Sequence, residues 1–123
     1  MNVNDYLAKQ YGPRGCWLLV ADVYAHELDK SVTGFRAINS SVRAIATEFR
    51  LALHKNPDGV AQLAAPAEMC IVLMSKIAGL SVHHCGIYYQ GSVLHALDTG
   101  NVYQDLASLQ DAYQVVEYWG LPA

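Results

Sequence analysis

The sequence predicts an α+β fold in which N-terminal helices pack on a C-terminal antiparallel sheet. Two observations support this prediction: the first half has apolar residues at helical spacing, and the second half consists of short β-prone runs separated by turn residues. The chain has 123 residues, of which 53% are hydrophobic, so it can build one core but is short for two ordinary domains. We therefore expect residues 1–123 to form a single domain.

Two helices are expected in the first half. A Gly-Pro-Arg-Gly turn at residues 12–15 precedes the segment Cys16 to Asp29, which starts apolar on nearly all sides and becomes charged later. This pattern is typical of a helix whose N-terminal end is buried. A second helix is predicted over Asn39 to His54, which has one apolar stripe with charged residues opposite.

Strands are expected in the second half. The segments Met69 to Met74, His84 to Tyr89 and Val93 to Ala96 are short apolar or β-prone runs. The last two are predicted to form a hairpin, because the turn residues Gln-Gly-Ser at positions 90–92 join them. The segment Tyr113 to Trp119, rich in Val and Tyr, is predicted to be a closing strand.

Composition argues against several classes of function. The formal net charge is -3, with 8 Lys and Arg residues and no basic run, so nucleic acid is not an expected partner. No apolar run approaches the roughly 20 residues that a bilayer span needs. The first ten residues lack the basic-then-apolar order of a signal peptide, so we expect a soluble chain without an export signal.

The cysteines predict a chain with free thiols. Cys16, Cys70 and Cys85 are odd in number and form no CxxC pair, which argues against a disulfide framework and suits a reducing cytoplasm. Cys70 and Cys85 lie in apolar strands, where a packing role is expected. Cys16 differs because it opens a predicted helix directly after a turn. Unpaired backbone N–H groups and the helix dipole favour a thiolate there, and the thiolate is the nucleophilic form.

A catalytic thiolate needs a base that can later protonate a leaving amine, and histidine does this best near neutral pH. The candidates in the sequence are His26, His54, His83, His84 and His95. Neighbours in a strand point to opposite faces, so only one of the adjacent pair at positions 83 and 84 should face the cysteine, and geometry alone does not choose between them. The histidine of the hairpin partner could hydrogen-bond the catalytic imidazole and complete a Cys-His-His triad.

Three segments resemble, in the same order, the motifs of the NlpC-type cell-wall cysteine peptidases, a papain-like family. Tyr-Gly at residues 11–12 followed by Gly-Cys-Trp-Leu-Leu-Val at 15–20 is similar to the nucleophile helix of that family. His-Cys-Gly-Ile-Tyr at 84–88 resembles its His-Val-Gly-Ile-Tyr strand, and Val-Leu-His-Ala at 93–96 resembles the following strand, which ends in His-Ala. Residues 68–74 and 113–122 also correspond in position to strands of the family.

The resemblance implies a papain-like NlpC-type fold and a role for each site residue. Cys16 would be the nucleophile, His84 the base in preference to His83, and His95 the residue that orients the base. For the oxyanion, the family suggests the backbone N–H of the nucleophile together with the hydroxyl of Tyr11. Two positions depart from the family pattern: Gly15 replaces an acidic residue, and Met-Cys at 69–70 replaces Gly-Asp.

The compact Cys-Trp-Leu-Leu-Val form resembles the versions found in bacteriophage and prophage tails. That implies an enzyme made in the bacterial cytoplasm, carried in the tail with other tail-tip proteins as possible partners, and acting at the cell wall. Its substrate would be the peptidoglycan stem peptide, cut between D-glutamate and the diamino acid without a cofactor. Alternatives are a structural tail-tip or tail-assembly protein with little or no hydrolysis, and a thiol acyltransferase or amidase that uses the same triad.

A metal site and a carboxylate pair are the remaining options. Cys16, His84, Cys85 and His95 are all zinc-ligand types, but no close pair has the spacing of a zinc finger, so no metal is expected. Asp105 is expected to cap a helix rather than to take part in catalysis.

Overall fold

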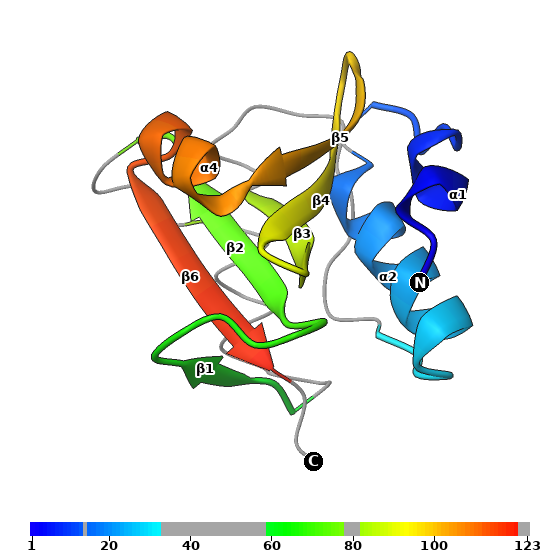
Figure 1. The fold of residues 1–123 in the computed structure, drawn as a ribbon, viewed down its shortest axis with the longest axis horizontal. Coiled ribbons are helices and arrows are strands. Elements are labelled where there is room, and N and C mark those ends of the chain that lie inside the picture. The colour runs from blue at the N-terminus through cyan, green and yellow to red at the C-terminus, as the bar shows by residue number, and fades with distance from the viewer. Residues whose placement is uncertain (14, 33–58, 78–81, 121–123) are drawn as a thin grey trace.

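An antiparallel sheet of six strands forms the centre of the computed structural model, which describes residues 1–13, 15–32, 59–77 and 82–120 (Figure 1). Its strands are β1 (Ala61–Leu63), β2 (Ile71–Ser75), β3 (His84–Tyr89), β4 (Ser92–Leu97), β5 (Gly100–Asp105) and β6 (Val115–Gly120). The strand order is β1-β6-β2-β3-β4-β5, and every neighbouring pair is antiparallel. The described helices are α1 (Val3–Leu7), α2 (Cys16–Glu27) and α4 (Leu106–Ala112). The α+β class is therefore confirmed, and among the described residues α1 and α2 precede the sheet in the chain.

Helix α2 begins at Cys16, as predicted, and ends two residues before the predicted end. Gly15 precedes the helix and supplies no side-chain cap. The helix packs against β3 and β4 (Figure 1), and its buried residues include Leu19, Val20 and Val23, all at 0% exposure. Tyr24 anchors the second half of the helix, because its hydroxyl donates to the Met69 carbonyl oxygen at 2.5 Å. The predicted helix over Asn39 to His54 lies outside the described residues.

The hairpin of β3 and β4 is confirmed. Its register pairs Ile87 with Leu94 and Tyr89 with Ser92, which leaves a loop of Gln90 and Gly91. Both loop residues have positive φ, 49° and 85°, the geometry that matches a two-residue turn to the twist of the flanking strands.

The predicted closing strand forms β6, but it does not close an edge. It lies between β1 and β2, pairing Trp119 with Gln62 on one side and with Ile71 on the other. Asp105 caps α4 as expected, because its carboxylate accepts from the Ser108 backbone N–H at 3.0 Å. Strands β1 and β5 and helix α1 were not predicted.

The two faces of the sheet build two apolar clusters. The cluster under α2 includes Cys16, Cys85, Ile87 and Leu94. The opposite cluster packs Leu109 of α4 and other residues against the sheet; its buried members are Cys70, Val72, Met74, Val93, Leu109 and Tyr113. Across the described ranges, no helix is both long and apolar enough to cross a membrane.

Candidate active site

Cys16 is the first residue of α2, and its side chain is buried between the helix and the sheet. Its sulfur is hydrogen-bonded to the Cys85 thiol and to the His84 imidazole. The Cys85 thiol is the strongest influence on the pKa of Cys16 and lowers it; burial opposes this effect, and the hydrogen bond and charge of His84 reinforce it. The net result is a Cys16 pKa well below its ordinary value, which favours the nucleophilic thiolate.

His84 and His95 form the next link. His84 Nε2 lies 2.8 Å from His95 Nδ1, and the two rings meet edge to face with an interplanar angle of 71°. Since Nε2 of His84 is engaged with His95, Nδ1 is the ring nitrogen left for Cys16. His95 is 1% exposed, and burial lowers its pKa to about 4, with a further lowering by the charge of His84. His95 is therefore neutral at neutral pH and acts as an uncharged hydrogen-bond partner of His84.

The structure thus brings together Cys16, His84 and His95, the three residues that the sequence singled out. His84 rather than His83 makes the two hydrogen bonds, which answers the question that strand alternation left open. The side chain of His84 and that of its neighbour Cys85 both reach the same sulfur. This differs from strict alternation, and the reason lies in the position of His84, which is the first residue of β3 at the end of the sheet.

Cys85 does more than the packing role expected of it. It is fully buried in the cluster under α2. Burial raises its pKa well above the ordinary value, and its hydrogen bond with Cys16 raises it further. Cys85 therefore keeps its proton, and its S–H can donate a hydrogen bond to the Cys16 thiolate. Cys70, by contrast, packs in the opposite cluster, and burial raises its pKa too.

Two further residues at this centre were missed by sequence reasoning. Gln104 of β5 accepts from the second nitrogen of His95, with 3.0 Å between Oε1 and Nε2. Tyr113, which follows α4, stacks on His84 with ring centroids 5.9 Å apart and planes 11° apart. The sheet register would have indicated Gln104, because it pairs with Val93, two residues before His95. That register depends on β5, whose mixed sequence gave no strand signal.

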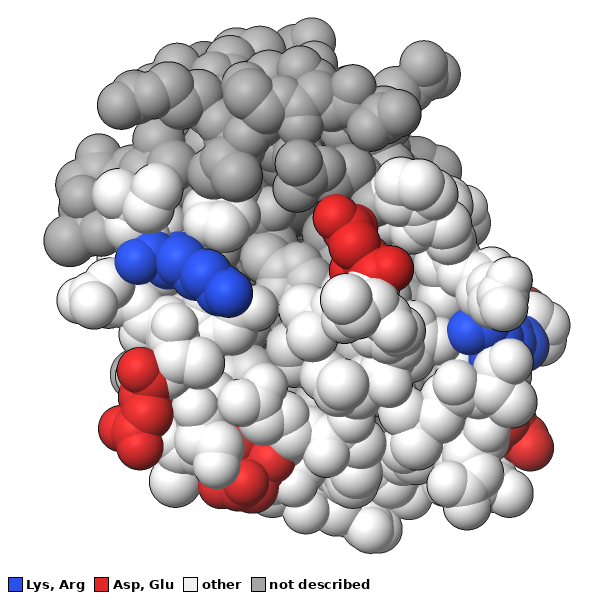
Figure 2. Space-filling view, turned by 90° about the horizontal axis from the view of Figure 1, so that it is seen from above, with Lys and Arg blue, Asp and Glu red and all other residues white. Residues whose placement is uncertain are grey.

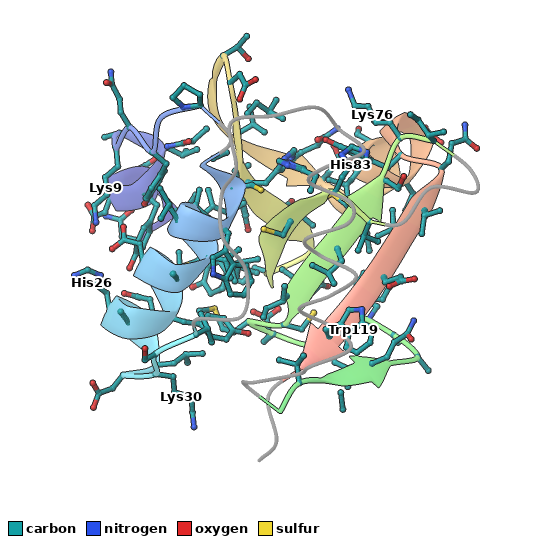
Figure 3. All side chains as sticks on the ribbon, turned by 180° about the vertical axis from the view of Figure 1, so that it is seen from behind. Lys9, His26, Lys30, Lys76, His83 and Trp119 are labelled. Atoms are coloured by element: carbon teal, nitrogen blue, oxygen red, sulfur yellow. The ribbon has the colours of Figure 1, made fainter. Side chains whose placement is uncertain are left out.

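The other histidines take different roles. His83 accepts from the Lys76 backbone N–H at 3.1 Å, and the two side chains lie at the same end of the sheet (Figure 3). Burial lowers the pKa of His83, while the nearby charge of Cys16 acts in the opposite direction. His26 is exposed on α2 and pairs with Asp22 at 2.8 Å. His54 lies outside the described residues.

The Tyr11 hydroxyl is engaged away from the Cys16 sulfur. It donates to Asp22 Oδ2 at 2.7 Å, and Asp22 follows Cys16 by six residues, or about 9 Å along the helix axis. Asp22 also accepts from Lys9 at 2.8 Å. Burial alone would raise the pKa of Asp22, but the hydrogen bonds from Lys9 and Tyr11 outweigh it and hold that pKa below its ordinary value. The hydroxyl expected to bind an oxyanion is thus committed to a carboxylate.

The glycine at position 15, directly before Cys16, has a steric reason. A Cβ atom at Gly15 would lie 2.5 Å from the Tyr11 carbonyl oxygen and 2.6 Å from the Tyr11 Cβ. Such distances do not occur between real atoms, so no side chain fits without moving the backbone. The acidic residue that the family resemblance would put here is therefore excluded by the path of the preceding loop.

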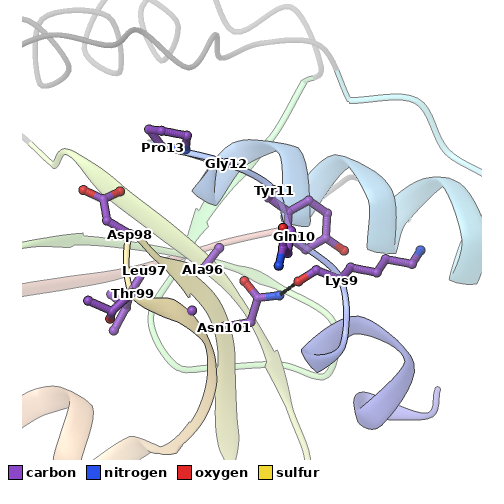
Figure 4. Close-up of a pocket in the computed structure, with 11 residues that line it drawn as sticks. Lys9, Gln10, Tyr11, Gly12, Pro13, Ala96, Leu97, Asp98, Thr99 and Asn101 are labelled. Atoms are coloured by element: carbon purple, nitrogen blue, oxygen red, sulfur yellow. Dashed lines mark hydrogen bonds between the residues drawn. The ribbon is translucent and has the colours of Figure 1, made fainter.

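A pocket of about 500 Å³ lies between the segment before α2 and the turn that joins β4 to β5 (Figure 4). One wall is the segment that leads into α2, and the other is the tip of the hairpin formed by β4 and β5; the lining residues are Lys9, Gln10, Tyr11, Gly12, Pro13, Ala96, Leu97, Asp98, Thr99, Gly100 and Asn101. Asn101 joins the two walls, because its Nδ2 donates to the Tyr6 carbonyl at 3.0 Å and to the Lys9 carbonyl at 2.6 Å. Ala96 follows His95 in β4, but neighbours in a strand point to opposite faces, and none of Cys16, His84 and His95 lines this pocket.

Surface charge, metal ligands and comparison with known proteins add no further assignment to the site. In the view from above, the described residues show scattered acidic and basic side chains without a large patch of either sign (Figure 2). Within the described ranges, no group of three or more His, Cys, Asp or Glu residues is arranged to hold a metal ion. Comparisons of the chain with protein-family models, with curated proteins and with solved structures find no match.

Proposed function

We propose that the protein is a papain-like, NlpC-type cysteine endopeptidase that cleaves the peptidoglycan stem peptide between D-glutamate and the diamino acid. The observation that carries the proposal is the continuous hydrogen-bonded series from Cys16 through His84 to His95. A thiol with a lowered pKa, a base in contact with it and a third group that orients the base together form the arrangement that nucleophilic catalysis requires.

The three residues have different roles in the proposed mechanism. The Cys16 thiolate attacks the peptide carbonyl carbon and forms a carbon–sulfur bond, while the carbonyl π electrons move to the oxygen and give a tetrahedral oxyanion. The imidazolium of His84 gives its Nδ1 proton to the leaving amine, and the C–N bond breaks to leave an acyl-enzyme. His84 then takes a proton from water, whose oxygen attacks the thioester and releases the acid and the thiolate. Throughout, His95 holds the His84 ring through Nε2.

The oxyanion is assigned to the N-terminus of α2. The backbone N–H of Cys16 is among the first four of the helix, which have no acceptor within the helix. The partial positive charge of the helix N-terminus also favours an anion there.

The setting proposed for this activity is a bacteriophage or prophage tail. The chain would be made in the bacterial cytoplasm and would meet the cell wall during infection. This part of the proposal rests on the resemblance of the motifs around Cys16, His84 and His95.

A structural tail-tip or tail-assembly role with little or no hydrolysis is the second candidate. The specific observation in its favour is the commitment of the Tyr11 hydroxyl to Asp22, together with the exclusion of an acidic side chain at Gly15. The first feature leaves the Tyr11 hydroxyl unavailable as an oxyanion donor, and the second leaves no acidic side chain next to Cys16.

Digestion of purified peptidoglycan separates the two candidates. We expect the wild-type protein to release stem-peptide fragments that mass spectrometry assigns to the D-glutamate bond. Cys16→Ala should release none, whereas Cys70→Ala, which removes a buried thiol outside the site, should retain cleavage. If folded wild-type protein releases no fragments, hydrolysis is refuted and the structural role is favoured.

A further inference from the structure

Gln104 ends the hydrogen-bonded series that starts at Cys16. It lies on β5, and its Oε1 is 3.0 Å from Nε2 of His95. The other nitrogen of His95, Nδ1, is 2.8 Å from Nε2 of His84. Both nitrogens of the buried imidazole are therefore engaged, one toward the amide of Gln104 and one toward the proposed base.

The orientation of the Gln104 amide sets the direction of these bonds. Its oxygen faces Nε2 of His95 in the structure, and because an amide oxygen only accepts, Nε2 carries a hydrogen in this arrangement. His95 is neutral at neutral pH, because burial lowers its pKa to about 4. A neutral imidazole has one N–H, which leaves Nδ1 of His95 as an acceptor. Nε2 of His84 must then carry the hydrogen of the bond between the two rings.

The consequence appears at Cys16. With a hydrogen on Nε2, neutral His84 has its lone pair on Nδ1, where it can take the thiol proton. After that transfer both nitrogens of His84 carry hydrogens, and each faces an acceptor: the Cys16 thiolate on one side and Nδ1 of His95 on the other. If His95 carried its hydrogen on Nδ1 instead, two N–H groups would face each other and the ion pair would lose a hydrogen bond.

We propose that Gln104 is a positioning residue whose amide oxygen sets the tautomer of His95 and, through it, directs the lone pair of His84 to Cys16. Gln104 does not touch the reacting atoms. The catalytic importance of this residue rests on the proposed hydrolase function, whereas the proton arrangement itself does not.

The test compares three variants with the wild-type protein. Gln104→Met keeps an unbranched side chain of similar length without the amide acceptor, and Gln104→Glu keeps an acceptor oxygen. Gln110→Met is the matched control, because that glutamine lies on α4 and donates to the Tyr118 hydroxyl away from the site. Nitrogen NMR of isotope-labelled histidine reports the tautomer of His95, and the rate of Cys16 alkylation against pH reports the thiolate. Neither readout needs a peptidoglycan substrate.

We expect wild-type His95 to carry its hydrogen on Nε2. Gln104→Met should mix the tautomers and move the alkylation profile of Cys16 up by about one pH unit, a tenfold loss of rate on its acidic side, as the loss of one hydrogen bond predicts. Gln104→Glu and Gln110→Met should keep the wild-type tautomer and profile.

Three results would overturn the inference: an Nδ1 hydrogen on wild-type His95, an unchanged tautomer and profile in Gln104→Met, or the same loss in Gln104→Glu as in Gln104→Met. The first needs no variant, so a folding defect does not block the test. If these readouts behave as expected while the wild-type protein leaves peptidoglycan intact, only the proposed hydrolysis fails.

Discussion

Gly86→Ala tests whether the contact between the two histidines depends on close approach of β3 and β4. A Cβ atom at Gly86 would lie 2.7 Å from the Leu94 carbonyl oxygen and 2.8 Å from Cβ of His95. Ordinary contact begins at 3.4 Å, so the strands must separate locally by about 0.6 to 0.7 Å. None of these neighbours is the flexible end of a side chain, so β4 itself has to move.

The size of the effect follows from that displacement. Overpacking of this kind destabilises a core by about 1–3 kcal/mol. The bond between His84 Nε2 and His95 Nδ1, now 2.8 Å, would lengthen beyond the usual limit of a good hydrogen bond. A misplacement approaching 1 Å can cost up to about 100-fold in rate. We therefore expect the rate of peptidoglycan cleavage to fall about 10- to 100-fold. We expect the free energy of unfolding to fall by about 1–3 kcal/mol.

The measurement pairs urea unfolding with the rate of fragment release. Gly120→Ala is the control, because its Cβ atom would meet the Cδ1 atom of Leu63 at 3.2 Å, at the end of a side chain that can rotate away. That variant should cleave at the wild-type rate. A Gly86→Ala protein with wild-type stability and activity would refute the reasoning, because it would mean that β4 does not constrain His95.

Three other predictions concern the same centre. Cys85→Ala should raise the pKa of Cys16 and move the acidic limb of its alkylation profile to higher pH, whereas Cys85→Ser, which keeps a donor, should not; an unmoved limb in both would contradict the role given to this thiol. His95 has a folded pKa of about 4 against an ordinary value of 6.5, so its contribution to stability is fully present above pH 6.5 and is lost as the pH falls toward 4. His95→Asn should therefore remove on the order of 3 kcal/mol of this pH dependence, measured as unfolding free energy across that window; an unchanged slope would argue against a buried neutral imidazole. Gly15→Asp should lower both stability and cleavage rather than restore a family-like acid, because its Cβ would lie 2.5 Å from the Tyr11 carbonyl oxygen; higher activity on peptidoglycan would contradict this.

The parts of the fold that sequence predicted are those specified within one short segment. The start of α2 at Cys16, the turn at Gln90 and the cap at Asp105 each depend on residues within a few positions of one another. Strand β1 is only three residues long and half-exposed, so no alternation marks it. Strand β5 is mostly polar and partly exposed, and it is recognised as a strand only by its pairing with β4.

The site follows the same division. Cys16, His84 and His95, which the structure brings together, could be proposed from the sequence because each belongs to a local motif with a chemical rationale. The preference for His84 over His83, however, came from a family resemblance and not from the residues alone. Gln104 and the second role of Cys85 depend on sheet register and on helix packing, which a single sequence does not specify. Tyr11 shows the opposite case. Its position in the motif suggested an oxyanion donor, but in the structure its hydroxyl donates to the Asp22 carboxylate.

The place of β6 in the sheet bears on how the chain reaches this structure. β6 is synthesised last among the described strands, yet it lies between β1 and β2 and is the strand on which β1 pairs. Its pairs with β2 are forty or more positions apart in the sequence, for example Ile71 with Trp119, and such non-local pairing makes folding slow. Until β6 leaves the ribosome, β2 has an unpaired edge rich in apolar residues, which is an aggregation hazard. Expression yield should therefore depend on how quickly this last strand is captured.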